Sequence, residues 1–146
     1  MGHAGGEVKV SEIDRFYRTL ACEAPDAIIY ADAEGRIAFW NRAAERIFGY
    51  PATEALGKTL DIIIPEKLRA RHARGFGETI RTGRTRYGAG EVLAVPAVHR
   101  DGRRLSIEFT ILPFRDRAGR ILGIAATLRD VTARFEKAKA SRSAPA

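Results

Sequence analysis

One histidine, His72, stands among apolar residues in a segment whose spacing predicts a helix. Residues three and four positions apart share a helix face, so His72 falls on one stripe with Leu68, Phe76 and Ile80. On such a stripe we expect the ring to point inward, where its nitrogens need a partner. A backbone carbonyl, a water molecule or a metal ion would each supply one. This histidine is therefore the first candidate for chemistry in the chain.

The remaining reactive residues do not form a catalytic arrangement. His3 lies in a glycine-rich start, and His99 falls in a predicted turn. The sequence has no Ser-His-Asp spacing, no metal-binding carboxylate cluster and no phosphate-binding loop. The single cysteine, Cys22, excludes an internal disulfide and is expected to be a small, partly buried apolar residue. We therefore expect a protein that is not an enzyme.

Composition and charge place the chain among ordinary soluble domains. Its 146 residues are 45% hydrophobic and 29% charged, with no membrane-spanning run and no secretion signal, so we expect one cytoplasmic domain that does not bind membranes. The net charge of +7 comes mostly from arginines spread from Arg15 to Arg142, with a local cluster between Lys67 and Arg86. Without a nucleic-acid-binding motif, this cluster favours a solvated surface rather than nucleic acid. A narrower alternative is an anionic ligand held near His72.

The order of predicted elements indicates an α+β fold. Ser11 is suited to cap a first helix and Asn41 to cap a helix from Arg42 to Phe48. In the segment from Arg104 to Leu112, alternation places Leu105, Ile107, Phe109 and Ile111 on one face of a strand. Five such strands predict an antiparallel sheet with short helices on one face and a flanking helix at each end. The expected divisions are a disordered start (1–10), a first helix (11–24), the domain (25–131), and a final helix with a frayed tail (132–146).

Two groups of motifs together resemble a PAS domain. The first half has the turn 32–35 and the run Asn41-Arg42-Ala43-Ala44-Glu45, which ends at Phe48-Gly49-Tyr50. The second half has His99-Arg100-Asp101-Gly102, the alternating strand, and Asp130-Val131-Thr132 before the last helix. The resemblance covers residues 16 to 135 and implies a sensory PAS fold. It also implies signalling to a downstream protein and a homodimer formed through the flanking helices and the sheet.

Within that family, the segment Ile64-Pro65-Glu66 to Arg71-His72 resembles the haem-binding PAS oxygen sensors. The resemblance implies haem b with His72 as the iron ligand, and a diatomic gas (O2, CO or NO) as the sensed molecule. Those sensors carry an arginine or methionine above the haem, whereas this chain offers Glu91 to Leu93. Oxygen is therefore less certain than haem. The flavin photosensors resemble the chain less, because their reactive cysteine is replaced by the run 41–44.

A haem site also implies residues around the ring. The apolar slot is expected to involve Leu68 and Phe76 on the helix, and opposite them Leu93, Val95, Ile107, Phe109, Ile111, Gly123 and Ala125. The haem propionates are expected to meet Arg81, Arg84, Arg86 or Tyr87. Gly75 and Gly77 indicate either close approach of a planar ligand or the end of the helix.

Two functional hypotheses follow. In the first, the chain is a haem-binding gas sensor that signals by conformational change, with incidental haem reactivity as a by-product. In the second, it is a haem-free PAS module for interaction or dimerisation, or a sensor of another small ligand. The sequence leaves open which gas would bind and whether the chain acts alone or within a larger signalling protein.

Overall fold

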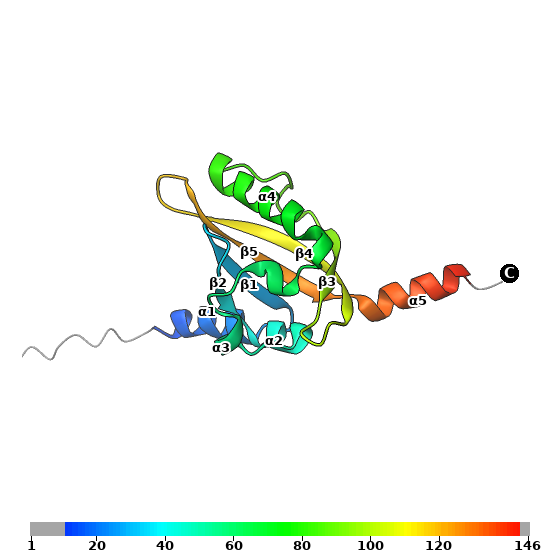
Figure 1. The fold of residues 1–146 in the computed structure, drawn as a ribbon. Helices are drawn as coiled ribbons and strands as arrows, with labels where there is room; N and C mark the ends of the chain where they lie inside the picture. The colour runs from blue at the N-terminus through cyan, green and yellow to red at the C-terminus, as the bar shows by residue number, and fades with distance from the viewer. Residues whose placement is uncertain (1–10, 144–146) are drawn as a thin grey trace, which may run out of the picture.

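The computed structural model describes residues 11–143, which form one five-stranded antiparallel sheet with helices around it (Figure 1). The order of the strands across the sheet is β2-β1-β5-β4-β3. Their bounds are β1 Ala27–Asp32, β2 Ile37–Trp40, β3 Leu93–Val98, β4 Arg104–Arg115 and β5 Ile121–Asp130. The predicted α+β architecture is confirmed. The expected disordered start at 1–10, which includes His3, and the tail from 144 lie outside the described residues.

Within residues 11–143, five α-helices and one 3-10 helix accompany the sheet. Their bounds are α1 Glu12–Glu23, α2 Arg42–Phe48, α3 Ala52–Ala55, η1 Leu60–Ile63, α4 Glu66–Thr82 and α5 Thr132–Ser143. The two predicted caps are present: the side chains of Ser11 and Asn41 accept hydrogen bonds from the backbone N–H groups of Asp14 and Ala44. No helix in residues 11–143 is long and apolar enough to cross a membrane.

Strand register divides the sheet into an inner and an outer face. Ile107 of β4 pairs with Val95 of β3, and Phe109 pairs with Leu128 of β5. Antiparallel partners project on the same side, so these four side chains share the inner face. The core lies between this face and the short helices, and its largest fully buried side chains are Phe48 and Ile107.

Asn41 fixes the junction of α1, β1 and α2. Its side-chain oxygen accepts hydrogen bonds from the N–H groups of Ile28 and Ala44, at 2.9 and 3.0 Å. Its amide nitrogen donates to the carbonyl oxygens of Ala21 and Asp26, at 2.9 and 3.1 Å. All of its hydrogen-bonding capacity is therefore used while the residue is only 3% exposed.

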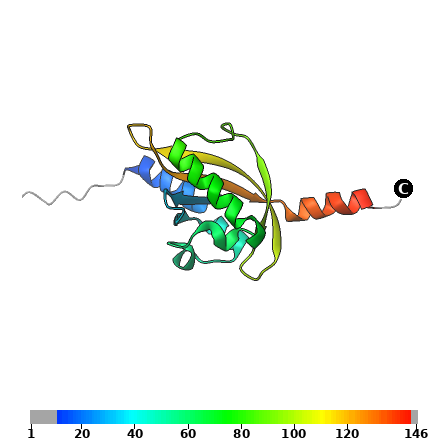
Figure 2. The same ribbon diagram turned by 45° about the horizontal axis from the view of Figure 1, so that its top comes forward.

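The helix that carries His72 lies over the inner side of the sheet without burying any of its residues (Figures 1 and 2). It continues unbroken past Gly75 and Gly77 and ends at Gly83, which adopts φ +72°. Of the two alternatives that the sequence left open for Gly75 and Gly77, the end of the helix is therefore wrong. Helix α4 therefore contributes little to the core beneath it.

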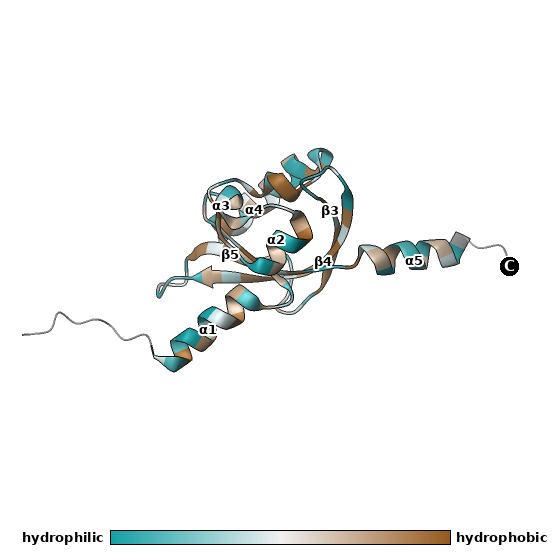
Figure 3. Cartoon of the chain, turned by 90° about the horizontal axis from the view of Figure 1, so that it is seen from below, coloured by the Kyte–Doolittle hydropathy of each residue, from teal (hydrophilic) through white to brown (hydrophobic). Residues whose placement is uncertain are grey.

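The opposite side of the molecule exposes apolar side chains. Helix α1 has no buried residue, and its exposed apolar side chains are Ile13, Phe16, Tyr17 and Leu20. Figure 3 shows apolar and polar residues mixed along α1, at the side of the sheet away from α4. Leu112 and Phe114 on the outer face of β4 are also exposed. Cys22 is exposed as well, so the expectation that it is partly buried is wrong.

Candidate functional site

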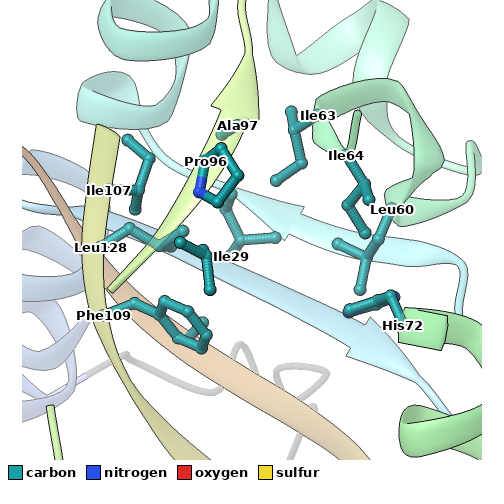
Figure 4. Close-up of a pocket in the computed structure, with 12 residues that line it drawn as sticks. Ile29, Leu60, Ile63, Ile64, His72, Pro96, Ala97, Ile107, Phe109 and Leu128 are labelled. Atoms are coloured by element: carbon teal, nitrogen blue, oxygen red, sulfur yellow. The ribbon is translucent and has the colours of Figure 1, made fainter. Parts of the chain in front are cut away.

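An apolar cavity of about 110 Å³ opens between the inner face of the sheet and the start of α4 (Figure 4). Its wall comes from η1, β1, β3, β4 and β5 together with one turn of α4. Apart from His72, the lining side chains contain carbon only: Ile29, Leu60, Ile63, Ile64, Val95, Pro96, Ala97, Ile107, Phe109, Ala126 and Leu128. The cavity therefore combines one nitrogen donor with an otherwise apolar surface.

His72 reaches this cavity from its edge. The residue is exposed overall, which corrects the expectation that it points inward and loses its contact with solvent. Its ring nevertheless lines the cavity and lies 6.1 Å from the ring of Phe76, centroid to centroid. Burial of the ring against the surrounding atoms lowers the pKa of His72, and the nearby Asp61 carboxylate partly offsets this.

Neither ring nitrogen of His72 has a hydrogen-bond partner among residues 11–143. The lowered pKa favours the neutral imidazole, which is the form that binds a metal ion. No group of three metal-binding side chains occurs in the described part of the chain. His72 could supply one ligand to a metal ion whose other ligands come with it, as in a porphyrin.

The structure brings together only part of the predicted wall. Val95, Ile107 and Phe109 line the cavity as predicted. Leu93 and Ile111 share the inner face, because they pair with Phe109 and Ala126, but they lie outside the lining.

Gly123 and Ala125 are placed on the wrong side of the sheet by the sequence prediction. Ala125 pairs with Tyr30, and Gly123 pairs with Asp32 across β1 and β5. An added Cβ at Gly123 would collide with the Tyr30 ring on the outer face. The β5 residues that reach the cavity are Ala126 and Leu128.

The other residues predicted for the haem site, on α4 and in the segment after it, do not line the cavity in this structure. Leu68 and Phe76 are half-buried on α4, while Arg81, Arg84, Arg86 and Tyr87 are exposed. Arg81 follows His72 by nine residues, or two and a half helical turns, so it projects from the opposite side of α4. The prediction that Arg81 contacts a propionate is therefore not supported by the geometry of the helix.

Several lining residues were missed by the sequence analysis. Ile29 lies in β1, where residues 27–31 are all apolar or aromatic, so the sequence does not indicate which of them point inward. The contribution of η1 had no sequence signal either. Leu60, Ile63 and Ile64 precede α4 in a short apolar run without a clear period.

The sheet order, the helices on its inner side and the cavity between them define an α+β module with an internal cavity. Comparison with known families gives the same result: the family described as the PAS fold matches residues 23–136. The chain therefore belongs to the PAS family and is a PAS sensory domain.

Relatives of this chain include proteins of signalling systems. An uncharacterized protein of Azorhizobium caulinodans is 31% identical over 141 residues, which is 96% of this chain and 18% of the relative. The sensor protein FixL of Bradyrhizobium diazoefficiens is 42% identical over 55 residues, covering 38% of this chain and 11% of FixL. The methanogenesis regulatory histidine kinase FilI of Methanothrix harundinacea is 29% identical over 124 residues, or 85% and 13% of the two chains. The chain spans less than a fifth of the length of each of these relatives.

Solved structures agree on the fold. The PAS domain of a protein from Colwellia psychrerythraea superposes with a TM-score of 0.72 at 20% identity, covering 84% of this chain and 99% of that one. An RNA-binding light-oxygen-voltage receptor superposes with a TM-score of 0.70 at 24% identity, covering 93% and 38%. At these identities the likeness concerns the fold alone.

Proposed function

We propose that this PAS domain binds haem b through His72 and senses a diatomic gas. One observation carries the proposal: an imidazole without a hydrogen-bond partner stands at the edge of a cavity whose other lining side chains are apolar. Haem would supply an iron atom with an open coordination position for O2, CO or NO. The similarity to the sensor FixL, although confined to 55 residues, supports a sensory role of this kind.

The lining residues fit the chemistry of haem, but the cavity is too small to admit a porphyrin unless the protein around it moves. Ligand pockets usually have volumes of roughly 300–1,000 Å³, whereas this cavity has about 110 Å³. A helix or strand must therefore move outward to admit a porphyrin. Helix α4 is suited to that movement because it buries none of its residues. Arg84 and Arg86, exposed in the segment after α4, would then be available to the propionates.

Strand β4 connects the cavity to the last helix. Ile107 and Phe109 project into the cavity, while Glu108 between them forms an ion pair with Arg134 of α5 on the outer side. The N–H group of Ser106 also donates to the side-chain oxygen of Thr132 at 3.0 Å. We expect ligand binding to displace β4 and thereby change the orientation of α5, which is the signal.

Absorption spectroscopy with a matched pair of variants tests the haem assignment. The full chain, expressed with haem supplied, is expected to show a Soret band that His72→Ala abolishes or shifts, because the variant loses the iron ligand. Arg71→Ala, which removes a side chain one position away, is expected to leave the band unchanged. A colourless wild-type protein, or a Soret band identical in His72→Ala, would contradict the proposal.

The exposed apolar surfaces support a second function, homodimerisation, which does not require haem. Four apolar side chains of α1 and two of β4 are open to solvent on the side of the sheet away from the cavity. A second copy of this chain would cover them, and apolar patches of this kind commonly mark protein interfaces. In the haem-free alternative, dimerisation or another small ligand would be the main role of the domain.

A further inference from the structure

Helix α4 and the residues after it carry most of the net charge of the protein. Residues 66–86 contain seven basic side chains and two acidic ones, Glu66 and Glu78, which leaves a net charge of +5 out of the total of +7. None of the seven forms an ion pair with a side chain of residues 11–143. The proposed haem would use only Arg84 and Arg86, so the positive charge on α4 itself has no role at the haem site.

The structure places four of these cations along one exposed side of α4. Lys67, Arg71, Arg74 and Arg81 are separated by four, three and seven residues, a spacing that keeps them on one helix face. We call these four residues the basic stripe. It extends about 21 Å, at 1.5 Å per residue, and lies on the side of α4 opposite His72. Glu78 is the single acidic residue on the same face.

Two glycines flank the basic stripe, and no contact within the described residues requires glycine at either position. Gly75 and Gly77 lie in the interior of α4, where each costs about 1 kcal/mol relative to alanine. A Cβ atom added at either position would meet nothing within 4 Å, so packing within this chain does not require them. They leave the backbone of α4 open to close approach from outside.

These features favour one kind of partner. A membrane-surface helix needs its apolar side beside the lipid, but the apolar side of α4 faces the cavity. A protein interface usually has large apolar side chains at its centre, and between its cations the stripe has only Ala70, Glu78 and the two glycines. The planar guanidinium group of arginine binds two phosphate oxygens at once. A single α-helix fits the major groove of DNA, whereas the deep, narrow major groove of double-stranded RNA does not admit it. We propose that the basic stripe binds the phosphate backbone of double-stranded DNA without sequence preference.

Fluorescence anisotropy of a labelled 20-base-pair DNA duplex of mixed sequence tests this proposal directly. With four phosphates neutralised, the logarithm of the affinity is expected to fall with the logarithm of the salt concentration with a slope of about −3.6, or about 150-fold between 50 and 200 mM KCl. The double variant Arg71→Gln/Arg74→Gln is expected to reduce the magnitude of that slope by about 1.8 and to weaken binding at every salt concentration. The control Arg15→Gln/Arg18→Gln removes the same charge from the exposed surface of α1 and is expected to change binding little.

The glycines provide a steric test that leaves charge unchanged. The double variant Gly75→Gln/Gly77→Gln is expected to weaken DNA binding several-fold, with circular dichroism confirming an intact fold. Absence of binding at 50 mM KCl, or equal weakening by the α1 control, would overturn the proposal. Equal or tighter binding of poly-glutamate, single-stranded DNA or an RNA duplex would overturn it as well.

Discussion

At the scale of single residues, His72 and Asn41 show two ways to hold a polar side chain beside an apolar interior. The nitrogens of His72 have no partner among residues 11–143, and the ring remains partly open to solvent. Asn41 is almost fully buried, and four hydrogen bonds satisfy it. His72 is therefore available to a ligand, whereas the hydrogen bonds of Asn41 stabilise the fold.

The hydrogen bonds of Asn41 make it a sensitive position for stability. Asn41→Ala removes the cap of α2 and leaves the buried N–H of Ile28 without its acceptor, so we expect a loss of roughly 2–4 kcal/mol in the free energy of unfolding. Urea denaturation measures this loss. Asn41→Asp keeps the two accepted bonds but places a carboxylate oxygen beside the carbonyl oxygens of Ala21 and Asp26, so it is also expected to destabilise the fold. Equal stability of Asn41→Ala and the wild type would show that the junction of α1, β1 and α2 does not depend on this side chain.

At the scale of secondary structure elements, helix α4 differs from the others that cover the inner side of the sheet. Helix α2 buries Ala43, Ala44 and Phe48, whereas α4 buries none of its residues. Stability within a protein is uneven, and elements with few buried contacts open most readily. Helix α4 is therefore the element we expect to move when the cavity is filled.

Hydrogen exchange followed by mass spectrometry checks this expectation about α4. Amides of α4 are expected to exchange faster than those of α2 in the haem-free protein, because less packing opposes local opening. Addition of haem is expected to slow exchange in α4 and leave α2 unchanged. Protection of α4 equal to that of α2 before haem is added would contradict the idea that this helix is the mobile wall of the cavity.

The elements also show how far the sequence can predict this molecule. Asn41 as a cap and the alternation from Leu105 to Ile111 are local signals, and the structure confirms the elements that they predict. The sequence prediction assigned the wrong residues of β5 to the inner face. Apolar or small residues occupy both faces of this strand, so the hydrophobic pattern does not show which face is the inner one. Only its pairing with β1 decides that Ala126, and not Ala125, reaches the cavity. The position of α4 relative to the sheet likewise depends on tertiary contacts. The apolar spacing of Leu68, His72 and Phe76 predicts a helix but not where that helix packs.

At the scale of the whole molecule, the two sides of the sheet serve different proposed roles. The inner side has the cavity and α4, while the outer side and α1 expose apolar residues. Ligand binding and self-association could therefore occur in one protein without competing for the same surface.

Light scattering of the full chain tests the proposed dimer. Phe16→Glu/Leu20→Glu places two charges on the apolar side of α1 and is expected to convert a dimer into a monomer, because burying unpaired charges is costly. Leu56→Glu alters an exposed apolar residue outside α1 and the sheet and is expected to leave the dimer intact. A dimer that survives the double substitution would show that α1 is not its interface.

The pairing of β1 with β5 also determines how this domain can be joined to other proteins. Ala27 at the start of β1 lies opposite Leu128 near the end of β5, and Asp26 and Arg129 form an ion pair of 3.0 Å at that point. The chain thus enters and leaves the sheet at neighbouring positions. A module of this design can be inserted into a longer polypeptide or arranged in tandem without stretching its sheet, and the preceding and following segments then meet at one shared anchor point.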